Sequence, residues 1–289
     1  MNVQTNGIAD QVRNFFPGVV KMPLFGPEGM RSPHYGLFRN DTSEGFGPAV
    51  SQQFVPHTTE DVVALVEATE SVFGEAAKVD LGFREGHYVG VTPADNLRRE
   101  VCDRDGVWPR LIIQARYGES FRATMGVYRD ACRNLHIMRS VTGTSVTIRH
   151  TSGLREKMNE LIADFGSLQG SWDTLVNRMQ TMARTPVRLA AFLDEMYPQT
   201  EAMTERSVTR HRSRTEAIIR RIMRERVALG NTSENLHEVS AWEAFNGIQG
   251  YIQHDKTRKG RPGDFDRAIM GMEDSVVARA ESLLLSMAV

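Results

Sequence analysis

The chain has 289 residues, of which 40% are apolar and 25% charged, a composition that suits a globular protein with a sizeable core. Its 35 basic and 36 acidic side chains give a formal net charge of −1. This excludes a uniformly basic protein surface of the kind that binds nucleic acid non-specifically. Two cysteines exclude a disulfide framework, and no stretch approaches the roughly 18 consecutive apolar residues of a membrane span. We expect a cytoplasmic protein with no membrane partner, in which any polyanion site is local.

The N-terminal half begins with an arm and continues as a mixed module. Residues 1–57 are rich in Gly, Pro and polar side chains, so we expect an irregular N-terminal arm there. Thr58-x-x-Asp61 resembles a capping box, and apolar residues then follow with helical spacing up to Gly74. Beyond it the apolar period becomes two, which predicts antiparallel hairpins. The predicted strands are 77–83, 87–92, 109–117, 121–129 and 144–149, so residues 58–151 form one α+β module.

Residues 152–289 have helical spacing throughout. Apolar residues from Leu154 to Met182 recur by alternating steps of four and three, which predicts one long spine helix that packs within the chain or against a second copy. Shorter helices are predicted after Thr185-Pro186, at the capping boxes Ser213-x-x-Glu216 and Ser240-x-x-Glu243, and from about 265 to 287. The predicted fold class is α+β, with an antiparallel β-hairpin sheet and a helix in the N-terminal half and a helical C-terminal half.

Charge is segregated along the chain. Residues 51–100 carry 4 basic and 9 acidic side chains, whereas residues 101–150 carry 8 arginines and 4 acids. Side chains alternate between the two faces of a strand, so an apolar face that begins at Leu111 leaves a cationic face opposite. That face is expected to carry Arg110, Arg116, Arg122, Tyr128 and Arg149.

Forked guanidinium groups suit phosphate oxygens, and an aromatic ring offers a base a stacking surface, so single-stranded nucleic acid fits this predicted face best. The competing interpretation is an ordinary polar sheet face, covered by the acidic segment. Two further basic stretches, Arg206 to Arg226 and residues 256–261, are interpreted as exposed surface rather than as binding faces.

Motifs for catalysis are missing from the sequence. It contains no phosphate-cradling G-x-x-x-x-G-K-[ST] loop, no G-x-G-x-x-G, no G-x-S-x-G and no H-E-x-x-H, so we expect no cofactor and no enzymatic activity. One acidic group could hold a divalent metal for a nuclease, although acids are also favoured at the start of a helix, and we prefer that interpretation. The group consists of Asp264, Asp266, Glu273 and Asp274.

One short motif resembles a known family. Arg129-x-x-Cys132-x-Asn134, with His150 in the following TIRHTSGL segment, is similar to a phage/plasmid-like family whose domain has no assigned function. The resemblance runs from about residue 36 to the C-terminus. It implies a gene of mobile elements, phages above all, and it supplies no catalytic residues. The hairpin-rich half that feeds a long helix is also similar in outline to phage single-strand annealing proteins such as Red beta, Erf and RecT, which bind single-stranded DNA as oligomeric rings.

Together these observations favour ATP-independent binding and annealing of single-stranded DNA in phage or mobile-element recombination or replication, by a homo-oligomer. Two alternatives from other classes remain open. One is a metal-dependent nuclease built on the acidic group. The other is a factor that binds a host protein and counters a host defence system.

Overall fold

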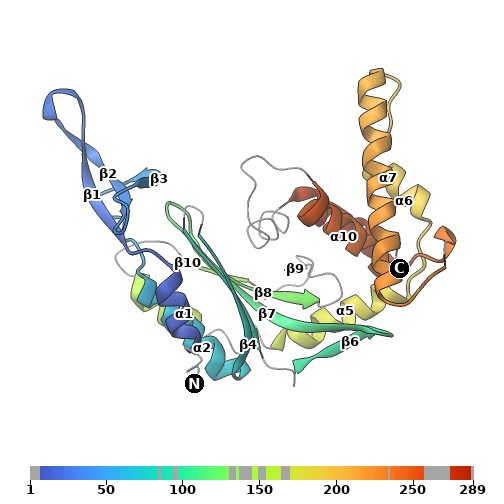
Figure 1. The fold of residues 1–289 in the computed structure, drawn as a ribbon, viewed down its shortest axis with the longest axis horizontal. Coiled ribbons are helices and arrows are strands. Elements are labelled where there is room, and N and C mark those ends of the chain that lie inside the picture. Colours follow the sequence, from blue (N-terminus) through green and yellow to red (C-terminus); the bar gives the residue numbers. More distant parts are fainter. Residues whose placement is uncertain are drawn as a thin grey trace, which may run out of the picture. The chain divides into compact units, whose positions relative to one another are not determined.

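A computed structural model describes residues 7–83, 86–93, 97–129, 135–136, 145–148, 154–163, 170–233, 235–256 and 274–287 (Figure 1). The chain divides into two compact units. Unit 1 comprises Met1–Asn96, Arg110–Met125 and Gly143–Gly170, and unit 2 comprises Leu97–Pro109, Gly126–Thr142 and Ser171–Val289. Each unit therefore takes up three stretches of the sequence, and the units do not coincide with a boundary near residue 152.

The expected α+β class is confirmed, with antiparallel strands in the N-terminal half and helices in the C-terminal half. The main sheet has the order β10-β8-β7-β5-β4, with β6 paired to β7 and β9 paired to β8. All five predicted strands are present within a few residues of their expected bounds. The seven strands are β4 (Ala76–Phe83), β5 (Gly86–Pro93), β6 (Arg99–Cys102), β7 (Asp105–Arg116), β8 (Phe121–Arg129), β9 (Leu135–His136) and β10 (Ser145–Ile148).

Residues 7–57 are more regular than the sequence indicates. After α1 (Ile8–Phe15) they form a sheet of β1 (Val19–Phe25), β2 (Arg31–Arg39) and β3 (Gly45–Val50), with the short turn η1 (Pro27–Gly29) between β1 and β2. Prolines in these strands suggested irregular backbone, but Pro23 and Pro48 lie on the two edge strands, where a missing N–H is tolerated. Pro33 lies in the part of β2 that precedes its pairing with β3, which begins at Tyr35. The expected irregular arm is thus a β-sheet.

Unit 1 packs its helices on this framework. The predicted capping box at Thr58 is confirmed and starts α2 (Thr59–Phe73), which ends at Gly74 with φ 87°. Helix α2 packs on α1, on β5 and on α3 (Leu154–Ala163). The apolar side chains that α2 buries are Val62, Val63, Leu65, Val66 and Phe73.

An aromatic cluster with two histidines fills the core of unit 1. His57 and His87 are 1% and 0% exposed, and His57 Nε2 lies 2.6 Å from His87 Nδ1. The Tyr117 ring stacks on His57 with centroids 4.3 Å apart, and its hydroxyl donates to the His57 carbonyl at 3.0 Å. Phe16 and Phe83 place their ring edges against His87. Burial lowers the pKa of His87 to about 3, so this imidazole is neutral in the folded protein.

Unit 2 is built around one helix that is buried on every side. Helix α8 (Ala241–Gly250) starts at the predicted capping box of Ser240, and nine of its ten residues are buried. It packs on α5 (Trp172–Arg184), α7 (Glu205–Ala228) and α10 (Ser275–Ser286). Gly247 and Gly250 permit the close approach to α7, because a side-chain carbon at either position would collide with Ile222 or Arg221. The chain leaves α8 through a π-helical turn, η4 (Tyr251–Asp255).

The predicted spine helix is described in two parts, α3 in unit 1 and α5 in unit 2, and residues 164–169 between them lie outside the described residues. The α5 half of the heptad pattern is buried as expected, through Trp172, Leu175, Met179 and Met182.

Two predicted helix starts are wrong. The helix expected after Thr185-Pro186 is α6 (Leu189–Met196), which begins three residues later because Pro186 bridges to Ser240. The box at Ser213 lies inside α7, whose N-cap is Thr204, so Ser213 starts no helix. Between α7 and α8 the chain forms only the short turn η3 (Leu236–Glu238) in the described residues.

The buried histidine pair predicts acid sensitivity. An unfolded chain binds a proton on each imidazole below about pH 6.5, whereas His87 in the folded state stays neutral down to a pKa of about 3. Stability is therefore fully present above pH 6.5 and falls with pH, by about 2 kcal/mol at pH 5 for this one group. Urea unfolding at pH 7.5 and pH 5 measures the loss.

His87→Phe keeps a ring in the cluster and removes the titrating group, so its stability should change less between the two pH values. The exposed His34 offers a control, and His34→Gln should leave the pH dependence of the wild-type protein unchanged. An unaltered slope in His87→Phe would contradict the assignment.

Candidate functional site

The residues of the predicted cationic sheet face differ in their exposure and in their ion pairing. Arg110 is 3% exposed, and its guanidinium reaches across the intervening strand β5 to pair with Asp80 of β4. Arg116 is partly exposed and pairs with Glu119 at 2.8 Å. In this part of β7 the residues of both faces are buried, Gln114 included, so the expected polar outer face is covered here.

Of the other three residues of that face, Arg122 and Tyr128 are more exposed than Arg110, and Arg149 is not among the described residues. Arg122 is exposed on β8, and Tyr128, farther along the same strand, is half-buried with its ring 6.1 Å from the ring of Trp108. Arg110 and Arg116 are thus occupied by ion pairs, and the role of the predicted face in binding nucleic acid stays a prediction.

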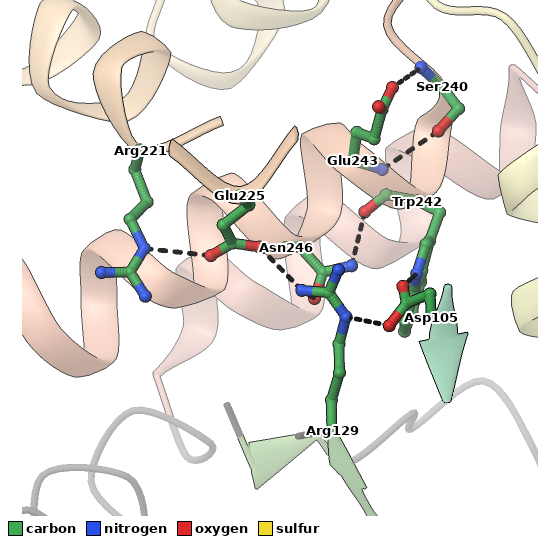
Figure 2. Close-up of polar contacts among 8 residues, drawn as sticks. All are labelled: Asp105, Arg129, Arg221, Glu225, Ser240, Trp242, Glu243 and Asn246. Atoms are coloured by element: carbon green, nitrogen blue, oxygen red, sulfur yellow. Dashed lines mark hydrogen bonds and ion pairs between the residues drawn. The ribbon is translucent and has the colours of Figure 1, made fainter. Parts of the chain in front are cut away.

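Arg129, the arginine of the family motif, is buried and forms ion pairs with two carboxylates. Figure 2 shows Arg129, 1% exposed at the end of β8, between two carboxylates of unit 2. Its Nε donates to Asp105 at 2.6 Å and its Nη1 donates to Glu225 of α7 at 3.0 Å. Trp242 Nε1 donates to the other Asp105 oxygen at 2.7 Å. The remaining motif residues, Cys132, Asn134 and His150, lie outside the described residues.

This network continues across α7 and α8. Glu225 also accepts from Arg221 at 3.0 Å, and Asn246 accepts from Arg129 at 3.3 Å while it donates to the Trp242 carbonyl at 2.8 Å. Arg129, Asp105 and Glu225 are thus ionic groups in a buried region, and Arg221 brings the second guanidinium to Glu225 from its partly exposed edge. Such a group is costly to leave unpaired, so we interpret Arg129 as the residue that holds β7, β8, α7 and α8 together.

The acidic group proposed for a nuclease is described at one position only. Asp264, Asp266 and Glu273 lie outside the described residues. Asp274 is the N-cap of α10, where it accepts from the Val276 amide at 3.0 Å and pairs with Lys256 at 2.8 Å. The position of the Asp274 carboxylate is therefore explained by its role as a helix cap. Among the described residues no group of three His, Cys, Asp or Glu side chains is placed to hold a metal ion.

A pocket of about 630 Å³ in unit 2 gathers the two basic stretches that the sequence keeps apart. Helix α7 contributes two arginines and a serine, the residue after α6 is a tyrosine, the π-helical turn contributes a second tyrosine, and the residue after this turn is a lysine. We call it the tyrosine–arginine pocket, and its polar lining is Tyr197, Arg210, Ser213, Arg214, Tyr251 and Lys256.

Some arginines of α7 have acidic partners and others do not. Toward the C-terminus of the helix, Arg221 and Arg224 pair with Asp255 of the π-helical turn. In the N-terminal half, Arg212 pairs with Glu216. Within the described residues Arg210 and Arg214 have no acidic partner; Arg214 instead lies 5.0 Å from the centroid of the Tyr197 ring. Both guanidinium groups consequently keep their hydrogen-bond donors available in the pocket.

Tyr197 is held in place by a neighbouring histidine. His211 Nε2 donates to the Tyr197 carbonyl at 2.5 Å, and because a carbonyl can only accept, His211 Nδ1 is left to accept from the Gln199 amide at 3.0 Å. Burial raises the pKa of Tyr197 to about 12, so its phenol stays protonated and can donate. The pocket therefore offers an anion two guanidiniums that have no acidic partner in the described part of the chain, and it offers a flat ligand two aromatic rings.

Sequence reasoning identified the basic stretches of α7 and of residues 256–261 but favoured exposed surface for both, and it missed the two tyrosines. Arg210 and Arg214 stand four apart on one helix face, which was a usable signal. No local signal links them to Tyr197 or Tyr251, because that proximity depends on how the C-terminal end of α6 and the π-helical turn lie against α7.

The described residues form an α+β protein whose sheets are antiparallel. A family model for the Domain of unknown function (DUF932) matches residues 49–284, and the chain belongs to this family. The resemblance to a family of unassigned function is thereby confirmed. Neither a curated protein nor a solved structure matches the chain, so the likeness in outline to phage annealing proteins gains no support. No helix in the described ranges has the length and apolar character to cross a membrane.

The buried network predicts a large difference between two arginines of the same strand. Arg129→Ala leaves Asp105 and Glu225 buried with an uncompensated charge, which costs about 3 to 5 kcal/mol. Arg122→Ala removes an exposed side chain from the same strand and should change the free energy of unfolding by about 0.5 kcal/mol or less. Urea denaturation followed by circular dichroism compares the two, and equal losses would contradict the structural role of Arg129.

Proposed function

We propose that this protein binds single-stranded DNA without ATP and promotes its annealing, as part of phage or mobile-element recombination or replication, and that the tyrosine–arginine pocket is its main contact. The observation that carries the proposal is the pair Arg210 and Arg214, which have no acidic partner among the described residues and line one pocket with two tyrosine rings.

The ligand class follows from the chemistry of the lining. Arginine donors match the oxygens of a phosphate, and a tyrosine ring stacks on any base because every base has an aromatic face. The bases of a duplex are stacked on one another inside the helix, whereas those of a single strand can turn into a pocket of this size. A single strand satisfies the arginines and the rings at the same time.

Other parts of the pocket agree with an anionic strand. Ser213 adds a hydroxyl from α7, and Lys256, which pairs with Asp274, adds an ammonium group to the lining. The absence of a phosphate-cradling glycine loop from the sequence favours a reaction driven by base pairing rather than by ATP. DNA rather than RNA is proposed because the family resemblance implies a gene of mobile elements, phages above all.

The pocket predicts which arginines of α7 matter for binding. The double variant Arg210→Ala/Arg214→Ala should weaken binding of a labelled oligonucleotide to all sequences alike and reduce the slope of log affinity against log salt by about 0.7 for each lost phosphate contact. Arg212→Ala is the matched control, because Arg212 belongs to the same helix and pairs with Glu216. Fluorescence anisotropy at several salt concentrations measures both.

The tyrosines predict a contribution of a different kind. Tyr251→Ala should cost about 1 to 3 kcal/mol of binding with the salt slope nearly unchanged, whereas Tyr251→Phe keeps the ring and most of the affinity. An annealing assay with complementary strands and no ATP should then rank the variants in the same order as binding does.

The predicted sheet face provides the contrast. If Arg122→Ala and Tyr128→Ala weaken binding while the pocket variants do not, the site is on β8 and the pocket assignment is wrong. If the wild-type protein fails to bind the oligonucleotide at low salt, the proposed function itself is wrong.

A further inference from the structure

The hairpin of β1 and β2 presents apolar side chains to solvent in unit 1. Figure 1 shows the two strands as a ribbon that extends past β3, and β3 pairs with β2 only from Tyr35 to Phe38. No residue from position 17 to 36 is buried. The exposed fractions of Met22, Phe25 and Met30 are 50%, 63% and 67%.

Exposure of this kind is unusual for a two-stranded ribbon, which has little stability of its own in water. Val20 and Met22 lie on one face, opposite Phe38 and Gly36. The other face is turned inward at its base, where Lys21 donates to the carbonyls of Gln52 and Phe54. The outer face and the tip, from Phe25 to Arg31, are thus the parts for which a covering partner is expected.

Unit 2 contains a cavity with the matching character. A pocket of about 570 Å³ between α6, α7 and the turn η3 is lined mainly by apolar side chains, which include Leu189, Ala191, Leu193 and Ile219. We call it the apolar pocket. Arg188 and Asp194 also line it, and neither has an ion-pair partner among the described residues.

One polar atom in the apolar pocket also points to an occupant. The Thr215 hydroxyl is buried, and it has no hydrogen-bond partner among the described residues. A buried hydroxyl without a partner is costly, and a polypeptide backbone supplies both donors and acceptors for it. A peptide segment with apolar side chains satisfies this lining better than a purely hydrocarbon ligand does.

We infer that the tip of the β1–β2 hairpin of one copy docks in the apolar pocket of a second copy. Phe25 and Met30 enter the pocket. Glu28 lies toward Arg188 and Arg31 toward Asp194, so that opposite charges meet on both sides of the apolar contact. The partner is therefore another molecule of this chain, recognised by complementary charge and by burial of two exposed apolar side chains.

The two surfaces are different, so the contact is head-to-tail. Each copy offers one hairpin and one pocket, and successive copies join until the assembly closes into a ring or continues as a filament. This inference is independent of the proposed DNA binding, because the apolar pocket and the tyrosine–arginine pocket share no lining residue.

The first experiment is size-exclusion chromatography with light scattering over a range of concentrations. The wild-type protein should exceed the 32.5 kDa of one chain, and Phe25→Glu/Met30→Glu should return it to that mass. Val227→Glu is the control, because Val227 is similarly exposed at 57% but lies on α7 and lines neither pocket. A wild-type mass of 32.5 kDa at every concentration would overturn the inference. This outcome includes a hairpin that docks in the pocket of its own chain, because such a protein is also monomeric.

The second experiment tests the pairing itself. Phe25→Glu/Met30→Glu retains an intact pocket, and Ala191→Trp, which fills the pocket, retains an intact hairpin. Each alone should be monomeric, and an equimolar mixture should form a one-to-one complex of about 65 kDa, twice the mass of one chain. Glu28→Arg should weaken assembly, and Arg188→Glu in the same chain should restore it. No complex in the mixture, or assembly that survives in Ala191→Trp, would overturn the inference that the hairpin docks in this pocket.

Discussion

Arg129 places a positive charge where water does not reach, and Asp105 and Glu225 are the carboxylates that make this position tolerable. The three residues come from β8, from the start of β7 and from α7, and Trp242 of α8 donates to the same Asp105. One guanidinium thereby determines how four elements of unit 2 meet. Since the C-terminal part of α7 is tied at Glu225, the arginines farther up that helix are held in a defined position relative to the π-helical turn.

This arrangement gives α7 a different character along its length. Its C-terminal half is neutralised by Glu225 and Asp255, whereas its N-terminal half carries Arg210 and Arg214 without acidic partners among the described residues. The helix also lines the apolar pocket through Ile219. One helix thus borders two cavities of opposite chemistry, and its buried ion pairs keep both in place.

In unit 1 the ring of Tyr117 has a comparable role. It stacks on His57 on one side and contacts Phe46 at the base of the three-stranded sheet on the other, with centroids 5.4 Å apart. Leu37, Val50 and Phe54 complete that contact. The hairpin therefore projects from a base that packs against the histidine pair, and protonation of His87 would loosen the aromatic cluster and this base together.

The sequence by itself determined the types of element and most of their positions. Alternating apolar residues located five strands, and the side-chain caps at Thr58 and Ser240 located two helix starts, because these patterns act over a few residues. The same cap pattern failed at Ser213, where α7 had already begun at Thr204. Tertiary structure alone decided which arginines are held in ion pairs and which line a pocket. Arg110 and Arg129 are neutralised by Asp80 and Glu225, 30 and 96 residues away in the chain, and Arg214 meets Tyr197 through helix packing. Whether a charged side chain faces solvent, a partner or a pocket depends on residues far along the chain, which no local pattern encodes.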